Sequence, residues 1–399
     1  MKAGWQSKSL AEILLKTETV NPNLQPESDF EYIDVSSVSN QTFQIGETQS
    51  LKGKDAPSRA RKLVKTNDIL FATIRPTLQR IAIVPSKLNN QVCSTGYFVL
   101  RPNESIHYKY LYYYLFADGF MGQMEALQKG ASYPAVTDNE VKSQSISFPL
   151  IPEQQRIVAI LDQAFEGIAK ARANAEQNLQ NARALFESHL QSVFTQRSDG
   201  WVENTLDNVC DLITCGVAAT PKYVDEAVGV PFLSAQNVRD GEVVLDKYRH
   251  ISKEFHRELT KKNKPARGDV LYSRVGSKFG EAGVVEHDFE FSVYVSLTLI
   301  KPKPEILNSY FLKHYLNSAI VKSIAIKSIS SSGVPNLNVK DVRQFPIRLP
   351  SITQQLKLIE EINVLRVETQ RLEALYQRKI ACLDELKKSL LQQAFAGEL

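Results

Sequence analysis

The fold is decided by a stretch that occurs twice: PLIPEQQRI at residues 149–157, and PSITQQLKL at residues 350–358, 201 positions later. Each copy begins with a proline and leads into a long segment without further proline, apart from Pro152 in the first copy, where Gly167 is the one interruption. On either side of these stretches, Asp68 recurs as Asp269, and Gly4-Trp5 recurs as Gly200-Trp201. The offset between the two copies is 196 residues at the Gly-Trp pair, as loop insertions would produce. The chain is therefore a tandem duplication of a whole domain, which predicts two similar units related by a pseudo-twofold axis.

The two proline-led segments predict long helices, because proline favours the first helical turn. Apolar residues recur in them at alternating spacings of four and three, the heptad pattern of a coiled-coil seam. In the first helix the predicted seam is Ile157, Leu161, Ala164, Ile168, Ala171 and Ala175 and, after a one-residue slip, Leu179, Ala182, Leu185 and Phe186. In the second it is Ile362, Leu365, Thr369, Leu372, Tyr376, Leu383, Leu386 and Leu390, with Lys379 in the remaining slot.

The predicted helices are too long for one small globular core to cover. A helix of about 42 residues is about 63 Å long at 1.5 Å per residue. Because there are two such helices, we expect them to pair as an antiparallel coiled coil with the mixed domains at opposite ends. The alternative, in which each helix packs only on its own domain, leaves most of each seam without a partner.

The remaining parts of each half mix strand and helix patterns. β-branched and aromatic residues predict strands at 30–38, 68–74 and 97–100, with counterparts at 231–233, 269–273 and 295–300. Short helices are predicted at 110–116 and 310–316. Irregular spacing of these elements favours an α+β fold over a doubly wound sheet. The predicted order is a mixed domain at 1–150, a helix at 151–199, a second mixed domain at 200–349 and a helix at 350–399.

The composition is that of a soluble globular protein, with 43% hydrophobic and 23% charged residues and a net charge of +4. No apolar run is long enough for a signal peptide or a membrane span, so we expect a cytoplasmic protein. The four cysteines lack metal-ligand spacing, and no metal site is predicted. There is no phosphate-binding loop, dinucleotide fingerprint or nucleophile elbow, so we expect no catalytic activity.

Basic residues cluster just before the equivalent strands of the two halves. The first cluster is Lys52, Lys54, Arg59, Arg61, Lys62 and Lys65, and the second is Lys261, Lys262, Lys264 and Arg267. A cationic group at the same place in both copies is what phosphate anchoring requires. For either cluster alone a solvated loop is the favoured interpretation, and the recurrence at the same site makes phosphate anchoring an equal alternative.

Polar residues that could read DNA bases follow the same strands. They are Arg75, Gln79 and Arg80 in the first half, and Arg274, Ser277 and Lys278 in the second. Arginine can contact guanine with two hydrogen bonds, glutamine can contact adenine, and serine can contact either. The loops at 129–134 and 331–336 also coincide, and their small residues fit either close approach to a partner or a tight packing turn.

The layout as a whole resembles the specificity subunits of type I restriction–modification systems. The resemblance extends over nearly all 399 residues and rests on the Gly-Trp openings, the Asp68-Ile69-Leu70 and Asp269-Val270-Leu271 strands, and the Pro-Glu-Gln-x-x-Ile start of the first helix. The end of the chain, residues 389–399, is also similar to the family terminus. The second helix departs from the pattern, with Thr353-Gln354-Gln355 in place of Pro-Glu-Gln.

The resemblance implies a non-catalytic DNA-recognition subunit in which each mixed domain is a target-recognition domain that reads one half of a bipartite site. It implies as partners two methyltransferase subunits and, through them, restriction subunits. It further implies that S-adenosylmethionine belongs to the methyltransferase partner, and ATP and Mg2+ to the restriction partner, with no cofactor in this chain. The alternative is a protein–protein adaptor that uses the paired helices to present its two domains.

Overall fold

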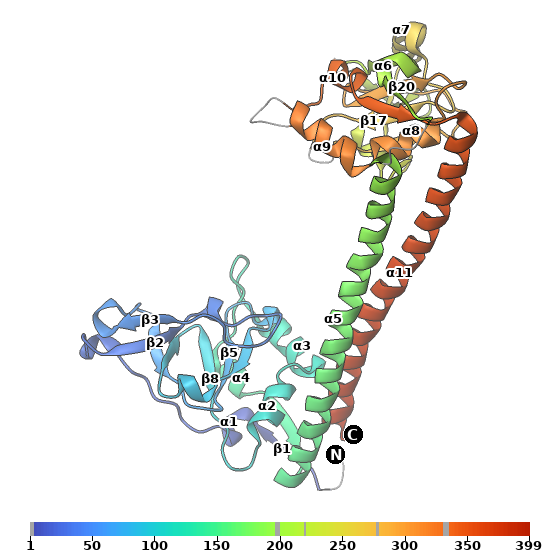
Figure 1. Ribbon diagram of the computed structural model, residues 1–399. Coiled ribbons are helices and arrows are strands. Elements are labelled where there is room, and N and C mark those ends of the chain that lie inside the picture. Colours follow the sequence, from blue (N-terminus) through green and yellow to red (C-terminus); the bar gives the residue numbers. More distant parts are fainter. Residues whose placement is uncertain (1–3, 196–199, 219–220, 277–278, 330–334) are drawn as a thin grey trace. The chain divides into compact units, whose positions relative to one another are not determined.

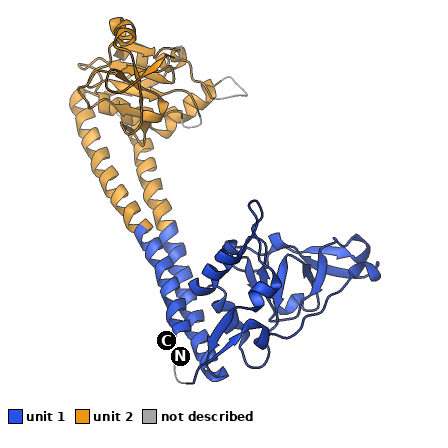
Figure 2. Cartoon of the chain, turned by 180° about the vertical axis from the view of Figure 1, so that it is seen from behind, with its two compact units in different colours: residues 1–176, 378–399 blue, residues 177–377 orange. Residues whose placement is uncertain are grey.

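The computed structural model describes residues 4–195, 200–218, 221–276, 279–329 and 335–399. The chain divides into two compact units, shown in different colours in Figure 2. Unit 1 comprises residues 1–176 and 378–399, and unit 2 comprises residues 177–377. Each unit contains one mixed body of strands and short helices together with part of each of the two long helices, α5 and α11 (Figure 1).

The mixed body of unit 1 is built on two small sheets and a two-stranded clasp. One sheet has the strand order β3-β2-β7-β4, the second has the order β6-β5-β8, and β1 pairs with β9. The elements are β1 (Gln6–Ser9), α1 (Leu10–Ile13), β2 (Asp29–Ile33), β3 (Gln49–Lys52), β4 (Ala60–Leu63), β5 (Ile69–Ala72), β6 (Ile81–Ile83), β7 (Val92–Ser94), β8 (Tyr97–Leu100), α2 (Tyr108–Tyr114), α3 (Asp118–Leu127), α4 (Asp138–Lys142), β9 (Ser145–Phe148) and α5 (Ile151–Thr195).

Unit 2 repeats this plan with one additional helix, α7. Its sheets have the orders β11-β20-β17-β18 and β12-β16-β13-β19, and two short pairs, β14-β15 and β10-β21, complete it. The elements are β10 (Val202–Thr205), α6 (Leu206–Val209), β11 (Cys210–Cys215), β12 (Tyr223–Val224), β13 (Val230–Leu233), β14 (Val238–Arg239), β15 (Glu242–Val243), β16 (Arg249–Ile251), α7 (Lys253–Asn263), β17 (Val270–Ser273), β18 (Ala282–Val284), β19 (Ser292–Val293), β20 (Leu297–Pro302), α8 (Ser309–Leu316), α9 (Ala319–Ser328), α10 (Val339–Arg343), β21 (Pro346–Leu349) and α11 (Ile352–Ala396).

The predicted strands and short helices lie where the sequence placed them, with one difference. β5, β8, β13 and β17 fall within or beside the predicted ranges, and α2 and α8 match the predicted short helices to within two residues. The predicted strand at 30–38 instead ends at Ile33, because residues 35–37 form a turn of 3-10 helix. The clasp strands β1 and β10, which follow each Gly-Trp, were not predicted. The last four residues of the predicted first long helix, 196–199, lie outside the described residues.

A buried glutamine fixes the start of each long helix. Gln154 donates to the carbonyl oxygens of Pro149 at 2.8 Å and Ser105 at 3.0 Å, and it accepts from the backbone N–H of His107. Gln355 makes the same three hydrogen bonds, to Pro350, Ile306 and Asn308. Both side chains are fully buried. Since a buried amide needs partners for each polar atom, this residue couples each helix start to the loop that precedes α2 or α8.

Each core is completed by the C-terminal end of a long helix. In unit 1, Leu391 and Ala394 of α11 belong to the main apolar cluster, and Phe395 packs edge-on against Tyr110 and Tyr114. In unit 2 the C-terminal end of α5 does the same through Phe194, which packs edge-on against Phe311 and Tyr315. Each aromatic set corresponds to the other at the 201-residue offset, so the duplication includes this packing.

Within each unit the two long helices run in opposite directions. In unit 1, Arg156 bonds to the carbonyl oxygen of Leu399, and Arg172 pairs with Asp384. Residues with higher numbers in α5 therefore contact residues with lower numbers toward the start of α11. In unit 2, Arg183 pairs with Glu373 at 2.8 Å, and the ring of Phe186 lies under the guanidinium of Arg366. The direction of the contacts in unit 2 is again antiparallel.

The buried face of the helices differs from the predicted seam at every second step of α11, and in α5 at Phe165 and Arg172, which lie beside the equally half-buried Ala164 and Ala171. It follows Leu161, Phe165, Ile168, Arg172, Ala175, Leu179, Ala182 and Phe186 in α5, and Ile362, Arg366, Thr369, Glu373, Tyr376, Ile380, Leu383, Lys387 and Leu390 in α11. Ile157 is also buried and Leu365 is half-buried. By contrast, Leu185, Leu372 and Leu386 are 51%, 37% and 47% exposed, so their assignment to the seam is corrected. With this phase no one-residue slip is needed.

The physical reason for the difference is that polar side chains occupy alternate positions of the seam. Arg366, Glu373 and Lys387 reach across to α5 through ion pairs and ring contacts. A rule that assigns leucine to the seam therefore selects Leu372 and Leu386, one residue away from the contacting positions. Only the contacts themselves reveal the correct phase.

Candidate nucleic-acid interface

The exposed feature at the end of β5 consists of Arg75 and the loop that lies beside it. Arg75 has left-handed backbone angles, φ 51° and ψ 58°, which cost energy in a residue with a side chain. Its backbone N–H donates to the carbonyl oxygen of Pro134 at 2.6 Å. Its guanidinium donates to the carbonyl oxygen of Ser132 at 3.1 Å and lies 4.9 Å from the ring centre of Tyr133.

Arg75 and Tyr133 together present a cation and an aromatic face to solvent. The Tyr133 side chain is 71% exposed, and Arg75 is also exposed. A guanidinium and a ring of this kind suit stacking or hydrogen bonding to nucleic-acid bases, and also contact with phosphates. Sequence reasoning identified Arg75 but missed Tyr133. The available signal was a large aromatic residue in a loop of small residues, next to proline.

The other predicted base readers of unit 1 do not gather with Arg75. Gln79 also has left-handed backbone, but it lines a pocket with Asp384 and Lys388 of α11. Arg80 donates to the carbonyl oxygens of Val38 and Ser36, which ties it to the loop after β2. These hydrogen bonds give the Arg80 side chain a structural role.

The first basic cluster is largely neutralised by partners. Lys52 and Lys54 both pair with Glu27, at 3.0 and 3.3 Å. Lys62 is half-buried between Asp138 and the carbonyl oxygen of Tyr97.

Two arginines and a lysine complete that cluster. Arg61 donates to the carbonyl oxygen of Ala60, and Lys65 pairs with Glu18. Arg59 is exposed and has no ion pair among the described residues. Arg59 and Arg61 are therefore the cations of this cluster without an ion pair among the described residues, and Arg59, beside β4, is the more exposed of the two.

The second basic cluster lies on a different element from the first. Lys261 and Lys262 are exposed in the last turn of α7, which has no helical counterpart in unit 1. Lys264 pairs with Glu290, and Arg267 pairs with Asp288 at 3.1 Å. The two clusters thus precede equivalent strands but are carried by a strand and turn in unit 1 and by a helix in unit 2.

Arg274 is a correction to the predicted base readers. It is 6% exposed, and its guanidinium donates to the carbonyl oxygens of Leu337 at 2.6 Å and Val295 at 3.1 Å and to Oδ1 of Asn336 at 3.0 Å. The side chain cannot reach a base without losing these three hydrogen bonds. Ser277 and Lys278 lie outside the described residues.

The strand register explains why Arg274 differs from Arg75. Ile74 bridges to Ala135, and Val275 bridges to Asn336, so the two bridges correspond at the 201-residue offset. Arg75 therefore corresponds to Gly276, and Arg274 corresponds to the buried Thr73. Gly276 has φ +100° and donates its N–H to Pro335, as Arg75 does to Pro134. The left-handed turn is common to both units, but only unit 1 places an arginine there.

Two ionisable groups elsewhere in the units have strongly shifted pKa values for structural reasons. A hydrogen bond from Arg101, aided by one from Lys65, lowers the pKa of Glu18 to about 2. Burial lowers the pKa of His314 to about 3, so this residue, which is 1% exposed, is neutral at physiological pH. Its Nε2 lies 3.2 Å from Oδ1 of Asn363 on α11. Among the described residues there is no group of three or more His, Cys, Asp or Glu side chains that could hold a metal ion.

Comparison with known proteins is decisive for the family. The model of the type I restriction modification DNA specificity domain matches the chain twice, at residues 2–177 and 198–375. The chain belongs to this family. The two matches are the two halves of the duplication, so the family domain occurs once in each half.

Individual relatives agree with the family. The EcoBI specificity subunit of Escherichia coli is 23% identical over 340 residues, which cover 79% of this chain and 70% of that protein. The crystal structure of the HsdS subunit from Thermoanaerobacter tengcongensis is 28% identical, with a TM-score of 0.69 and coverage of 100% of this chain and 98% of that one. A chain from a structure of type I R–M system assembly and conformational transition is also 28% identical, with a TM-score of 0.88 and coverage of 100% and 99%.

The family membership gives the chain its role. It is a DNA specificity subunit of a type I restriction–modification system, and such subunits recognise DNA without catalysing a reaction. The fold, with mixed helix and sheet content in two repeated domains, is that of its structural relatives. None of the helices described in the structure is long and apolar enough to cross a membrane.

Proposed function

We propose that each unit reads one half of a bipartite DNA target, and that α5 and α11 pair along their whole length as an antiparallel coiled coil that sets the distance between the halves. Two methyltransferase subunits and, through them, restriction subunits would assemble on this scaffold in the cytoplasm. In this proposal S-adenosylmethionine is bound by the methyltransferase, and ATP and Mg2+ by the restriction subunit, with no cofactor in this chain.

The observation that carries the proposal is that each long helix contributes to both units. α5 begins beside the unit 1 core and ends with Phe194 in the unit 2 core, while α11 begins in unit 2 and ends with Phe395 in the unit 1 core. Continuous helices are stiff, rising 1.5 Å per residue, so two of them shared in this way are suited to hold two readers at a set distance.

In unit 1 we propose that the DNA-contacting surface includes Arg75, Tyr133 and Arg59, which are exposed and carry a cation or an aromatic face. In unit 2 the exposed candidates among the described residues are Lys261 and Lys262 at the end of α7. The different cationic elements support the reading of two unlike half-sites.

The spacer between half-sites provides the test. The half-sites are first obtained by mapping methylated adenines in host DNA with and without the gene. Binding of the chain with its cognate methyltransferase is then measured on duplexes whose spacer is one base pair longer or shorter. One base pair moves a half-site by about 3.4 Å and rotates it by roughly a tenth of a turn, so specific binding should be lost.

The outcomes separate the alternatives. Equal binding at every spacer length would contradict a fixed separation. If no DNA is bound at low salt even with the methyltransferase present, the protein–protein adaptor would be the better account, because electrostatic DNA binding is strongest at low salt. A duplex with one half-site scrambled and the spacer unchanged serves as the control for loss of base recognition.

A further inference from the structure

Two ion pairs join the long helices at positions related by the duplication. In unit 1, Arg172 of α5 pairs with Asp384 of α11, and in unit 2, Arg183 of α5 pairs with Glu373 of α11 at 2.8 Å. Adding 201 to 172 gives 373, and adding 201 to 183 gives 384, so the same two repeat positions meet in both units. In both meetings α5 supplies the arginine and α11 supplies the carboxylate.

Two cation–ring contacts between the long helices are also related by the 201-residue offset. In unit 1, Nζ of Lys387 on α11 lies 5.3 Å from the ring centre of Phe165 on α5. In unit 2, the guanidinium of Arg366 on α11 lies 5.9 Å from the ring centre of Phe186 on α5. Position 165 corresponds to 366, and 186 corresponds to 387. In both contacts α5 supplies the ring and α11 supplies the cation.

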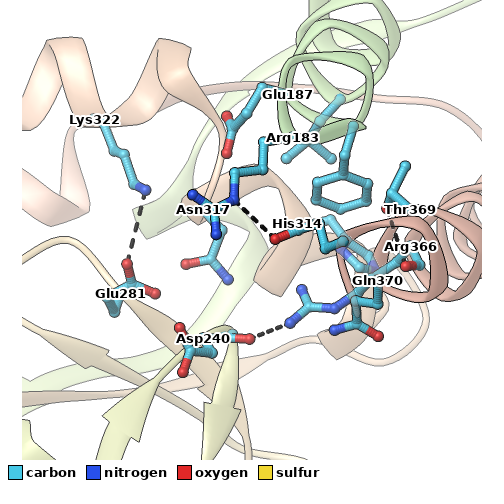
Figure 3. Close-up of a pocket in the computed structure, with 14 residues that line it drawn as sticks. Arg183, Glu187, Asp240, Glu281, His314, Asn317, Lys322, Arg366, Thr369 and Gln370 are labelled. Carbon is cyan, nitrogen blue, oxygen red and sulfur yellow. Dashed lines mark hydrogen bonds and ion pairs between the residues drawn. The ribbon is translucent and has the colours of Figure 1, made fainter. Parts of the chain in front are cut away.

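Figure 3 shows the unit 2 members of this set around one pocket, with Arg183 and Arg366 directed into it from the two long helices. Arg366 also donates to the carbonyl oxygen of Asp240 in the loop between β14 and β15. In unit 1, Lys387 is likewise held by its recognition domain, because it lies 4.8 Å from the ring centre of Phe43. Both cations of α11 therefore bind their own unit as well as α5.

Because the helices derive from one repeat, an α5 helix could in principle pair with a second α5 in the same register. That pairing would place Arg172 opposite Arg183 and Phe165 opposite Phe186. The two arginines would then face each other at both ends of the pair, and neither ring would receive a cation. Like charges placed opposite each other are destabilising.

The corresponding pair of two α11 helices is worse. It would place Glu373 opposite Asp384 and Arg366 opposite Lys387, so both contacts would join like charges, each occurring twice. The apolar pair of Leu179 and the equivalent Ile380 cannot discriminate by charge, because both residues accept either partner. Discrimination by charge between like and unlike helices rests on the charged and aromatic positions.

We propose that these four contacts specify the pairing of α5 with α11 and prevent a chain from pairing its helices with the like helices of a second copy. A polar residue at a coiled-coil seam commonly selects the partner in this manner. The inference rests on the proposed pairing of the helices along their whole length. It adds the residues that make this pairing exclusive.

The test is a full-length variant in which the unit 2 contacts exchange sides: Arg183→Glu, Phe186→Lys, Arg366→Phe and Glu373→Arg. Within the chain both contacts between the helices are kept, since a carboxylate still faces an arginine and a ring still faces a cation, and only the hydrogen bond from Arg366 to Asp240 is lost. Between like helices every contact becomes complementary, because the unit 1 positions are unchanged. The variant should therefore fold normally but lose the discrimination against a second copy.

The readout is the mass by sedimentation after two differently labelled copies are unfolded together and refolded. Wild type should return at the mass of one copy, and the exchanged variant should form two-copy species in at least tenfold greater yield. The matched control, Leu179→Ile with Ile380→Leu, exchanges an apolar pair and should behave as wild type. If the fourfold variant does not recover its helical content, Arg183→Glu with Glu373→Arg tests the charges alone in the same assay.

Equal yields of two-copy species from wild type and the exchanged variants would overturn the inference, whether both are low or both are high. The spacer experiment is independent of this result. A wild-type chain that shows spacer-dependent DNA binding while the exchanged variant stays at single-copy mass would leave the proposed function intact and remove only the pairing rule.

Discussion

Replacing Arg274 and Arg75 by alanine should have opposite effects on stability and DNA binding. Arg274 is buried and donates to two backbone carbonyl oxygens and one side-chain amide. Without Arg274 the carbonyl oxygens of Leu337 and Val295 lose a hydrogen-bond donor. Each buried acceptor left unpaired lowers the free energy of unfolding by about 1–3 kcal/mol. Arg274→Ala should therefore lower the free energy of unfolding by about 2–6 kcal/mol.

Arg75 is exposed, and its contacts with Ser132 and Tyr133 lie at the surface. Arg75→Ala should change the free energy of unfolding by less than about 1 kcal/mol. If Arg75 contacts a base, its loss should weaken binding to the specific site by about 1–3 kcal/mol, which is roughly 5- to 150-fold.

The two effects are measured by urea denaturation followed by circular dichroism, and by fluorescence anisotropy of labelled duplexes with the methyltransferase present. Arg274→Lys is the control, because it keeps the charge but cannot make the forked set of hydrogen bonds. An unfolding midpoint of Arg274→Ala equal to that of wild type would refute the structural role. Normal specific binding by Arg75→Ala would refute the DNA contact, and an equal loss on every sequence would assign Arg75 to phosphate.

Three further predictions follow from buried groups and the long helices. Gln154→Ala or Gln355→Ala should each lower the free energy of unfolding by about 2–4 kcal/mol, because three hydrogen bonds to backbone groups are lost. Gln155→Ala, at the exposed neighbouring position, is the control and should lower it by less than about 0.5 kcal/mol. Urea titration measures both. The folded pKa of His314 is about 3, below the value of 6.5 for an ordinary histidine. The unfolded chain therefore binds more protons between these values, and the free energy of unfolding should fall as the pH drops below 6.5, by about 2 kcal/mol at pH 5. His314→Gln should reduce this pH dependence, and an unchanged pH profile would contradict the prediction. Leu372→Pro should lower the free energy of unfolding by at least about 3 kcal/mol and disrupt assembly with the methyltransferase. Leu372→Ala should have a small effect, because the side chain is 37% exposed. Normal assembly of the proline variant would refute the role of the long helix.

The duplication and the long helices could be predicted from sequence because they depend on local, repeated signals. Pro152 and Pro350 mark the helix starts, and the residues that follow form helices to Thr195 and Ala396. The antiparallel direction follows from the length of the helices and from their number. The seam phase could not be obtained in this way, since Leu372 and Glu373 are adjacent and only contact with Arg183 shows which one faces α5.

The candidate interface was less accessible to prediction because similar residues carry different roles in the two units. Arg75 and Arg274 look equivalent when the sequence is read after each strand, but the bridges of Ile74 and Val275 place them two positions apart in the repeat. One side chain points to solvent and the other is enclosed. Charge clusters were equally ambiguous, because Lys52 and Lys54 share the carboxylate of Glu27, which lies far away in sequence.

The discontinuous composition of unit 1 has a consequence for synthesis on the ribosome. Unit 2 is one uninterrupted stretch, residues 177–377, whereas unit 1 is incomplete until residues 378–399 have been synthesised after unit 2. Leu391, Ala394 and Phe395 belong to the unit 1 core or pack on it. Residues 1–176 of unit 1 are therefore made before unit 2, but unit 1 is completed only after unit 2, and a chain that lacks residues 378–399 is damaged in unit 1.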